Sequence, residues 1–90
     1  MDQSPSKEQL HSALFMNLVL TFQAASMQAL GKVDNPVTGK AEKNREQAKM
    51  SIDMLDMLEV KTQNNLTTEE ANFLSRVVAD LKMVYVQESK

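Results

Sequence analysis

The longest run without a charged side chain covers residues 9–31. Thirteen of the eighteen positions from 13 to 30 are apolar, and neither proline nor glycine interrupts the run before Gly31. This pattern predicts one long helix over residues 7–30. Its apolar positions surround nearly the whole helix, so we expect it to be buried on most sides or inserted in a membrane.

Both ends of this helix have boundary signals. Ser6 followed three residues later by Gln9 fits a capping box, in which each side chain bonds a free backbone N–H of the first turn. Gly31 can adopt the left-handed conformation in which helices often end. Residues 1–6 are predicted to form a disordered N-terminal tail.

Polar residues within the first helix favour a soluble protein over a membrane span. Asn17, Thr21 and Gln28 fall on one narrow stripe, and neither end carries the Trp or Tyr typical of a membrane interface. We therefore expect a buried helix of a soluble, cytoplasmic protein. The N-terminus also lacks the pattern of a signal peptide.

Residues 32–40 are predicted to connect two helices. Asn35-Pro36 favours an extended or turn conformation, and Gly39 adds a second flexible point. Thr38-Gly39-Lys40 is similar to the end of a phosphate-binding loop, but the earlier glycine and the preceding strand are missing. We interpret the tripeptide as an ordinary loop.

The second predicted helix, residues 41–62, carries two apolar stripes. One stripe consists of Ala41, Ala48, Ile52 and Leu55, and the other of Met50, Met54 and Met57. Together they span about 220° of the helix, at 100° per residue, which is more than one neighbouring helix covers. The second helix should therefore contact two surfaces.

The third predicted helix, residues 68–87, has the clearest start signal in the chain. Thr67 and Glu70 form a second capping box, with Leu66 in position for a hydrophobic staple. Asn64 is suited to a left-handed turn at the end of the second helix. The short connection predicts an antiparallel hairpin of the second and third helices.

These elements predict an all-α, three-helix protein with a single domain at residues 7–87 and a short tail at 88–90. A chain of 90 residues has a thin core, so association with copies or partners is expected. The net charge of −2 is spread evenly, and no basic patch supports nucleic-acid binding. The absence of cysteine excludes disulfides and thiolate metal sites.

Few residues offer catalytic chemistry. His11 is the only histidine and has no recognisable nucleophile motif around it. Asp53, Asp56 and Glu59 form a carboxylate ridge, but a di-iron site would need Glu-x-x-His pairs. Methionines at helical spacing are more often core or contact residues than copper ligands. We therefore expect neither an enzyme nor a cofactor or metal site.

The first helix has more apolar surface than one hairpin covers. One face comprises Leu14, Phe15, Leu18, Val19, Phe22, Ala25 and Ala29, and the other Ala13, Met16, Leu20, Ala24 and Met27. Soluble monomers seldom expose an apolar patch of several hundred Å². We therefore predict an obligate homodimer, which Leu20→Glu or Met27→Glu should unfold. The predicted interface residues are Met16, Leu20, Ala24, Met27, Met50, Met54 and Met57.

The charges of the second helix are unevenly ordered. Residues 40–49 carry a net charge of +2, and residues 50–61 a net charge of −2. This order opposes the helix dipole. It reflects either chance or pairing with an antiparallel second copy.

Several segments resemble the bacterial proteins grouped as domain of unknown function 1844. These segments are FxxL at 15–18, QALG at 28–31, PVTG at 36–39, AxxxIDMLxMLExKT at 48–62, NLTxEE at 65–70 and LKMxYV at 81–86. The chain departs from the family pattern at Asn64, where glycine is favoured. The resemblance implies a small all-helical protein without an assigned activity.

Three functions fit these observations. The first is a homo-oligomeric interaction or scaffold module with a further protein partner. The second is a peripheral membrane or membrane-partner adaptor that uses the uncharged first helix. The third is a helical protein that binds a small molecule.

Overall fold

The computed structural model describes residues 4–89, which fold as three helices: α1 (Lys7–Ala29), α2 (Arg45–Lys61) and α3 (Thr68–Glu88). The only β pairing in this part of the chain is an isolated antiparallel bridge between Leu30 and Lys43. The all-α class is therefore confirmed. The first three residues of the predicted N-terminal tail and the last residue of the chain lie outside the described range.

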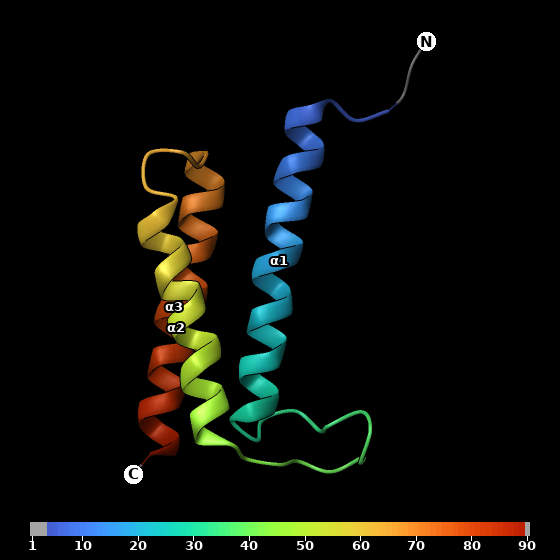
Figure 1. The fold of residues 1–90 in the computed structure, drawn as a ribbon, viewed down its shortest axis with the longest axis vertical. Coiled ribbons are helices and arrows are strands. Elements are labelled where there is room, and N and C mark those ends of the chain that lie inside the picture. Colours follow the sequence, from blue (N-terminus) through green and yellow to red (C-terminus); the bar gives the residue numbers. More distant parts are fainter. Residues whose placement is uncertain (1–3, 90) are drawn as a thin grey trace.

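The three helices lie side by side (Figure 1). α2 and α3 run antiparallel and pack along their length, and α1 lies beside α2 in the opposite direction to it. α1 also contacts α3. The long connection between α1 and α2 closes one end of the molecule, and the short turn between α2 and α3 lies at the other end.

Local capping fixes the ends of α1 as the sequence predicted. The Ser6 hydroxyl accepts a hydrogen bond from the Gln9 N–H at 3.1 Å, and the Gln9 side chain accepts one from the Ser6 N–H at 2.9 Å. At the other end, Gly31 has a φ of 77°. The N–H groups of Gly31 and Lys32 then bond the carbonyls of Gln28 and Met27, which is the Schellman arrangement.

α2 begins at Arg45, four residues after the predicted start at Ala41. Residues 41–44 do not extend the helix because they are held against the end of α1. Lys43 forms the bridge with Leu30, and the Asn44 N–H donates to the Ala29 carbonyl at 2.8 Å. Asn44 then caps α2 through its side-chain oxygen, which accepts from the Gln47 N–H.

The turn between α2 and α3 follows the predicted signals. Asn64 has a φ of 65° and so occupies the left-handed region that glycine adopts most readily. Thr67 Oγ1 accepts from the Glu70 N–H at 3.1 Å, and Glu70 Oε1 accepts from the Thr67 N–H at 2.8 Å. The Thr67 N–H and a hydrogen bond from Ser12 of α1 both lower the pKa of Glu70. The cap of α3 is therefore also linked to α1.

Thr67→Ala is expected to lower the free energy of unfolding by about 0.5–2 kcal/mol, because it removes the acceptor for the Glu70 N–H. Thr68→Ala, one position inside α3, is the matched control and should cost much less. Urea unfolding monitored by circular dichroism measures both. Equal losses at the two positions would mean that Thr67 is not the capping residue.

The C-terminal end of α3 lies one residue beyond the predicted end of the third helix. α3 continues to Glu88, and Ser89 caps it. Glu88 forms ion pairs with Lys32 and Lys43 from the α1–α2 connection. Ser89 accepts a hydrogen bond from Arg45, whose guanidinium also lies 5.7 Å from the ring centroid of Tyr85. These long-range contacts hold the C-terminal end of α3 in place.

The Glu88 ion pairs predict a stability change at acidic pH. Hydrogen bonds from Lys32 and then Lys43 lower the pKa of Glu88 from 4.5 to about 2. The folded state therefore binds a proton less readily than the unfolded chain, and the stabilisation is complete above pH 4.5. It is lost as the pH falls from about 4.5 to about 2.

Glu88→Gln should accordingly lower the free energy of unfolding at pH 7, and the difference from the parent should disappear near pH 2. Urea unfolding at a series of pH values measures this difference. Glu69→Gln, on an exposed residue of α3, is the control. A Glu88→Gln difference that does not change between pH 7 and pH 2 would contradict the assigned role of the ion pairs.

The core lies where all three helices meet. Its buried apolar residues are Val19, Ala29, Leu30, Ala48, Ile52, Leu55, Leu74, Val77, Val78 and Leu81. Small side chains occupy the contact between α1 and α2, where Ser26, Ala29 and Ala48 are buried. The Ser26 hydroxyl donates to the Phe22 carbonyl at 2.8 Å, so its burial leaves no unpaired donor.

Candidate interaction surface

α1 is far less buried than its sequence predicts. Its buried residues are Val19, Ser26 and Ala29. Large apolar side chains elsewhere on α1 remain exposed: Leu10 by 48%, Leu14 by 56%, Leu18 by 42% and Leu20 by 45%. The single chain therefore buries one side of α1, and burial of its other sides would need a second surface. As the sequence indicated, the hairpin of α2 and α3 is too narrow to surround α1. The two helices lie along one side of α1 and cover only that side.

The chain as a whole is extended and exposes surplus surface. Its radius of gyration is 15.1 Å, whereas a compact domain of this length has about 12 Å. Its accessible surface is 6717 Å², whereas a folded monomer of this mass exposes about 5,300 Å². The exposed apolar side chains form part of this surplus of about 1,400 Å².

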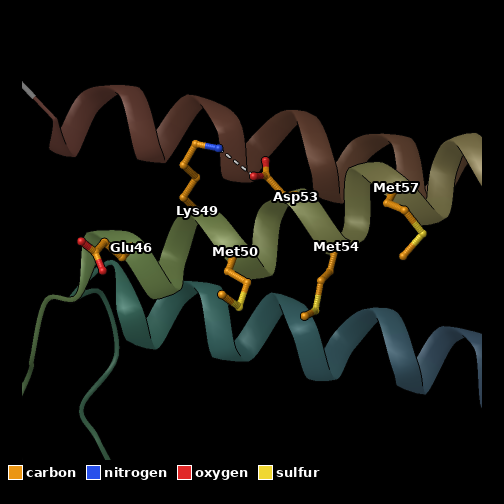
Figure 2. Close-up of a pocket in the computed structure, with 6 residues that line it drawn as sticks. All are labelled: Glu46, Lys49, Met50, Asp53, Met54 and Met57. Atoms are coloured by element: carbon orange, nitrogen blue, oxygen red, sulfur yellow. Dashed lines mark hydrogen bonds and ion pairs between the residues drawn. The ribbon is translucent and has the colours of Figure 1, made fainter.

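The methionine stripe of α2 lies on an open groove. Met50 is 60% exposed, Met54 39% and Met57 47%. Figure 2 shows these three side chains on the side of α2 nearer α1, with Lys49 and Asp53 on the side nearer α3. The groove has a volume of about 460 Å³ and is lined by the three methionines together with Glu46, Lys49 and Asp53. α2 thus presents a flexible apolar surface beside α1.

The neighbouring flank of α1 continues this surface. Ala25 and Ala29 line a small pocket together with Gln47 of α2, so they mark the seam between the two helices. Leu18 lies seven residues before Ala25, and Leu14 lies eleven residues before it. Residues at these spacings lie on the same side of a helix. On α2, Met54 lies seven residues after Gln47 and is therefore on the seam as well.

α1 and α2 are antiparallel. Leu18 lies seven residues before Ala25 and Met54 lies seven residues after Gln47, so both are the same distance from the pocket and are level with each other. Exposed apolar residues of α1 and α2 therefore flank the seam on its two sides, and we name them together the α1–α2 apolar strip. It consists of Leu10, Leu14, Leu18, Met50, Met54 and Met57.

The structure does not bring together all of the predicted interface residues. Met50, Met54 and Met57 belong to the α1–α2 apolar strip. Met27 packs against the core, and Met16 is half-buried. Leu20 and Ala24 are exposed. Leu20 is two positions from Leu18 and so lies on the opposite flank of α1, away from the methionines.

Several of the unevenly ordered charges at residues 40–61 have partners within the chain. Lys43 Nζ pairs with Glu88 at 2.9 Å, and Arg45 bonds Ser89. Asp56 pairs with Lys82 of α3 at 3.1 Å. Lys49 Nζ pairs with Asp53 at 2.7 Å within α2, and this hydrogen bond raises the pKa of Lys49. Packing against α3 therefore accounts for much of the charge order, without a second copy.

The residues weighed for catalytic chemistry do not converge. His11 is exposed on α1, and no group of three potential metal ligands occurs within residues 4–89. The carboxylates of Asp53 and Asp56 are directed to different lysines. Thr38-Gly39-Lys40 lies in a turn closed by a hydrogen bond from the Asn35 N–H to the Lys40 carbonyl, and no helix begins there.

α1 is the one helix in the described part of the chain that is long and apolar enough to cross a membrane. Core helices of soluble proteins and signal sequences share this property, so it carries little weight on its own. Only 11% of its most apolar window is buried within the chain. Burial of the exposed apolar side chains of α1 therefore requires a surface other than α2 and α3.

Sequence reasoning missed two features of this surface. The first is the flank of α1 that joins the methionines, since the wheel placed Leu14 and Leu18 on the face assigned to the hairpin. The second is the cluster that ties Glu88 and Ser89 to the start of α2. The available signal for the cluster was the group of basic residues at 40–45, which carries a net positive charge.

Comparison with known proteins gives one match. The chain matches the family described as Domain of unknown function (DUF1844) over residues 12–87, which includes all of α2 and nearly all of α1 and α3. No curated protein and no solved structure matches it. The matched range covers every core residue and all of the α1–α2 apolar strip except Leu10, and the chain belongs to the DUF1844 family.

Proposed function

We propose that this protein is a homo-oligomeric interaction module, in its simplest form a dimer, that acts without catalysis of its own. The observation that carries the proposal is the α1–α2 apolar strip on an extended chain with surplus surface. Soluble monomers seldom leave such a surface in water. A standard interface buries about 800 Å² on each partner, which the surplus of about 1,400 Å² can supply.

The features outside the strip support a binding role. Lys32 and Lys43 of the long connection pair with Glu88 of α3, and Lys49, Asp53 and Asp56 of α2 also form ion pairs within residues 4–89. The groove on α2 is open and its surface is mainly apolar, and two of its charged lining residues, Lys49 and Asp53, pair with each other. Enclosed sites with a few directed polar groups are typical of enzymes and small-molecule sites.

Sedimentation equilibrium of the full chain at several concentrations tests the proposal. We expect a folded species of twice the 10.1 kDa chain mass or a higher multiple. Circular dichroism on the same samples shows whether the species is helical. A folded, soluble 10.1 kDa monomer at all concentrations would overturn the proposal.

The membrane-adaptor alternative is tested on the same preparation. Vesicles of phosphatidylethanolamine and phosphatidylglycerol are sedimented with the protein at physiological salt. We expect the oligomer to remain in the supernatant. Quantitative sedimentation with the vesicles, together with a monomer in their absence, would show that lipid rather than a second copy covers α1.

A further inference from the structure

The α1–α2 apolar strip has charged residues at its two ends. Glu46 lies one turn before Met50, and Lys61 lies one turn after Met57. Neither forms an ion pair with another residue in the range 4–89, unlike Lys49, Asp53 and Asp56. The strip thus ends in one negative and one positive group, neither of which is paired within the described residues.

The order of these residues is self-complementary. Glu46 and Lys61 are equally far from the midpoint between Asp53 and Met54, and so are Met50 and Met57. A two-fold axis through that midpoint places two copies of α2 antiparallel. It brings each Glu46 to a Lys61 and each Met50 to a Met57, which are favourable contacts in both copies.

The flank of α1 fits the same axis. Leu18 is level with Met54, so the axis passes beside it, and no charged residue occurs on α1 after Glu8. Lys49 and Asp53 pair with each other on the side of α2 nearer α3, at the edge of this contact. The two seams together then form a four-helix arrangement of α1 and α2 from each copy.

We infer that a second copy of this chain docks on the α1–α2 apolar strip about this two-fold axis. Met50 packs on Met57 of the partner subunit, and Glu46 pairs with Lys61 of the partner subunit. The inference rests on the proposed function and adds its surface, symmetry and register. Methionine suits this role because its unbranched side chain adapts to a second methionine surface.

Cysteine cross-linking tests the register, because the natural chain has no cysteine. Met50→Cys and Met57→Cys chains are mixed, unfolded in urea, refolded together and oxidised. We expect disulfide-linked heterodimers from the mixture and little cross-linking from either variant alone. Identical residues are separated by about 10 Å along the helix axis in this arrangement, and a disulfide needs Cα atoms within about 7 Å.

Met54→Cys should cross-link with itself, since it lies next to the axis. Met83→Cys is the matched control, because Met83 is 61% exposed on α3 and lies outside the strip. Cross-linking of Met50→Cys alone, or none between Met50→Cys and Met57→Cys in a protein that sediments as a dimer, would overturn the register and leave the proposed function intact. A monomer in sedimentation would overturn both.

Charge reversal gives an independent measurement. Glu46→Lys and Lys61→Glu should each raise the dissociation constant of the dimer about tenfold, since each places like charges together twice per dimer. The combined variant should restore the original value. Failure of the combined variant to recover would contradict the Glu46–Lys61 pairing.

Discussion

Leu55→Ala is expected to lower the free energy of unfolding by about 2–5 kcal/mol. Leu55 is 0% exposed on α2 and belongs to the core in which all three helices meet. Removing its branched end leaves a cavity that the surrounding helices fill only in part. A small domain has a total stability of about 5–15 kcal/mol, so this single change removes a large share of it.

Urea unfolding followed by circular dichroism measures the effect, at one fixed protein concentration because association adds to stability. Met83→Ala is the control on an exposed methionine of α3 and should change the free energy by less than about 0.5 kcal/mol. A Leu55→Ala loss similar to that of the control would contradict the placement of Leu55 at the centre of the core.

The parts of the fold that local chemistry determines could be predicted from the sequence. Ser6, Gly31, Asn64 and Thr67 mark helix ends, and each performs the capping or turning role that its residue type favours. These signals act over three or four residues, so they do not depend on how the helices pack. The apolar face of α2 around Leu55 was also predictable, because it follows from the helical spacing of apolar residues within α2.

The start of α2 could not be predicted from local signals alone. Residues 41–44 contain good helix formers, and the lysines at 40 and 43 are also compatible with a helix. Local signals therefore gave no reason to begin α2 later than Ala41. The structure uses these residues to hold the end of α1, through the Leu30–Lys43 bridge and the Asn44–Ala29 hydrogen bond. Tertiary contacts outweighed the propensity of four residues, and Asn44 then supplied the cap.

The direction in which α1 packs was also beyond the sequence. Its apolar residues surround the helix, so their periodicity favours no single side. The small side chains of Ser26, Ala29 and Ala48 determine which side of α1 packs against α2, because they allow the two helices to approach closely. The methionine stripe itself was predictable, but the flank of α1 that extends it follows only from the packed arrangement.

Leu18 and Leu20 are exposed to similar extents but lie on opposite flanks of α1. Their exposed fractions are 42% and 45%. If a second copy covers the α1–α2 apolar strip, Leu18→Glu puts a carboxylate into an apolar contact twice per dimer. Burying an unpaired charge is costly, so we expect the dissociation constant to rise at least about 100-fold.

Leu20→Glu, on the flank away from the methionines, should leave the dimer largely intact. Sedimentation equilibrium gives the dissociation constants, and circular dichroism on the same samples shows whether loss of the dimer also unfolds the chain. If folding depends on association, Leu18→Glu should lose helicity on dilution and Leu20→Glu should keep it. The opposite outcome, with Leu20→Glu dissociated and Leu18→Glu dimeric, would move the interface to the other flank of α1 and restore the grouping with Met16, Ala24 and Met27 that the sequence predicted.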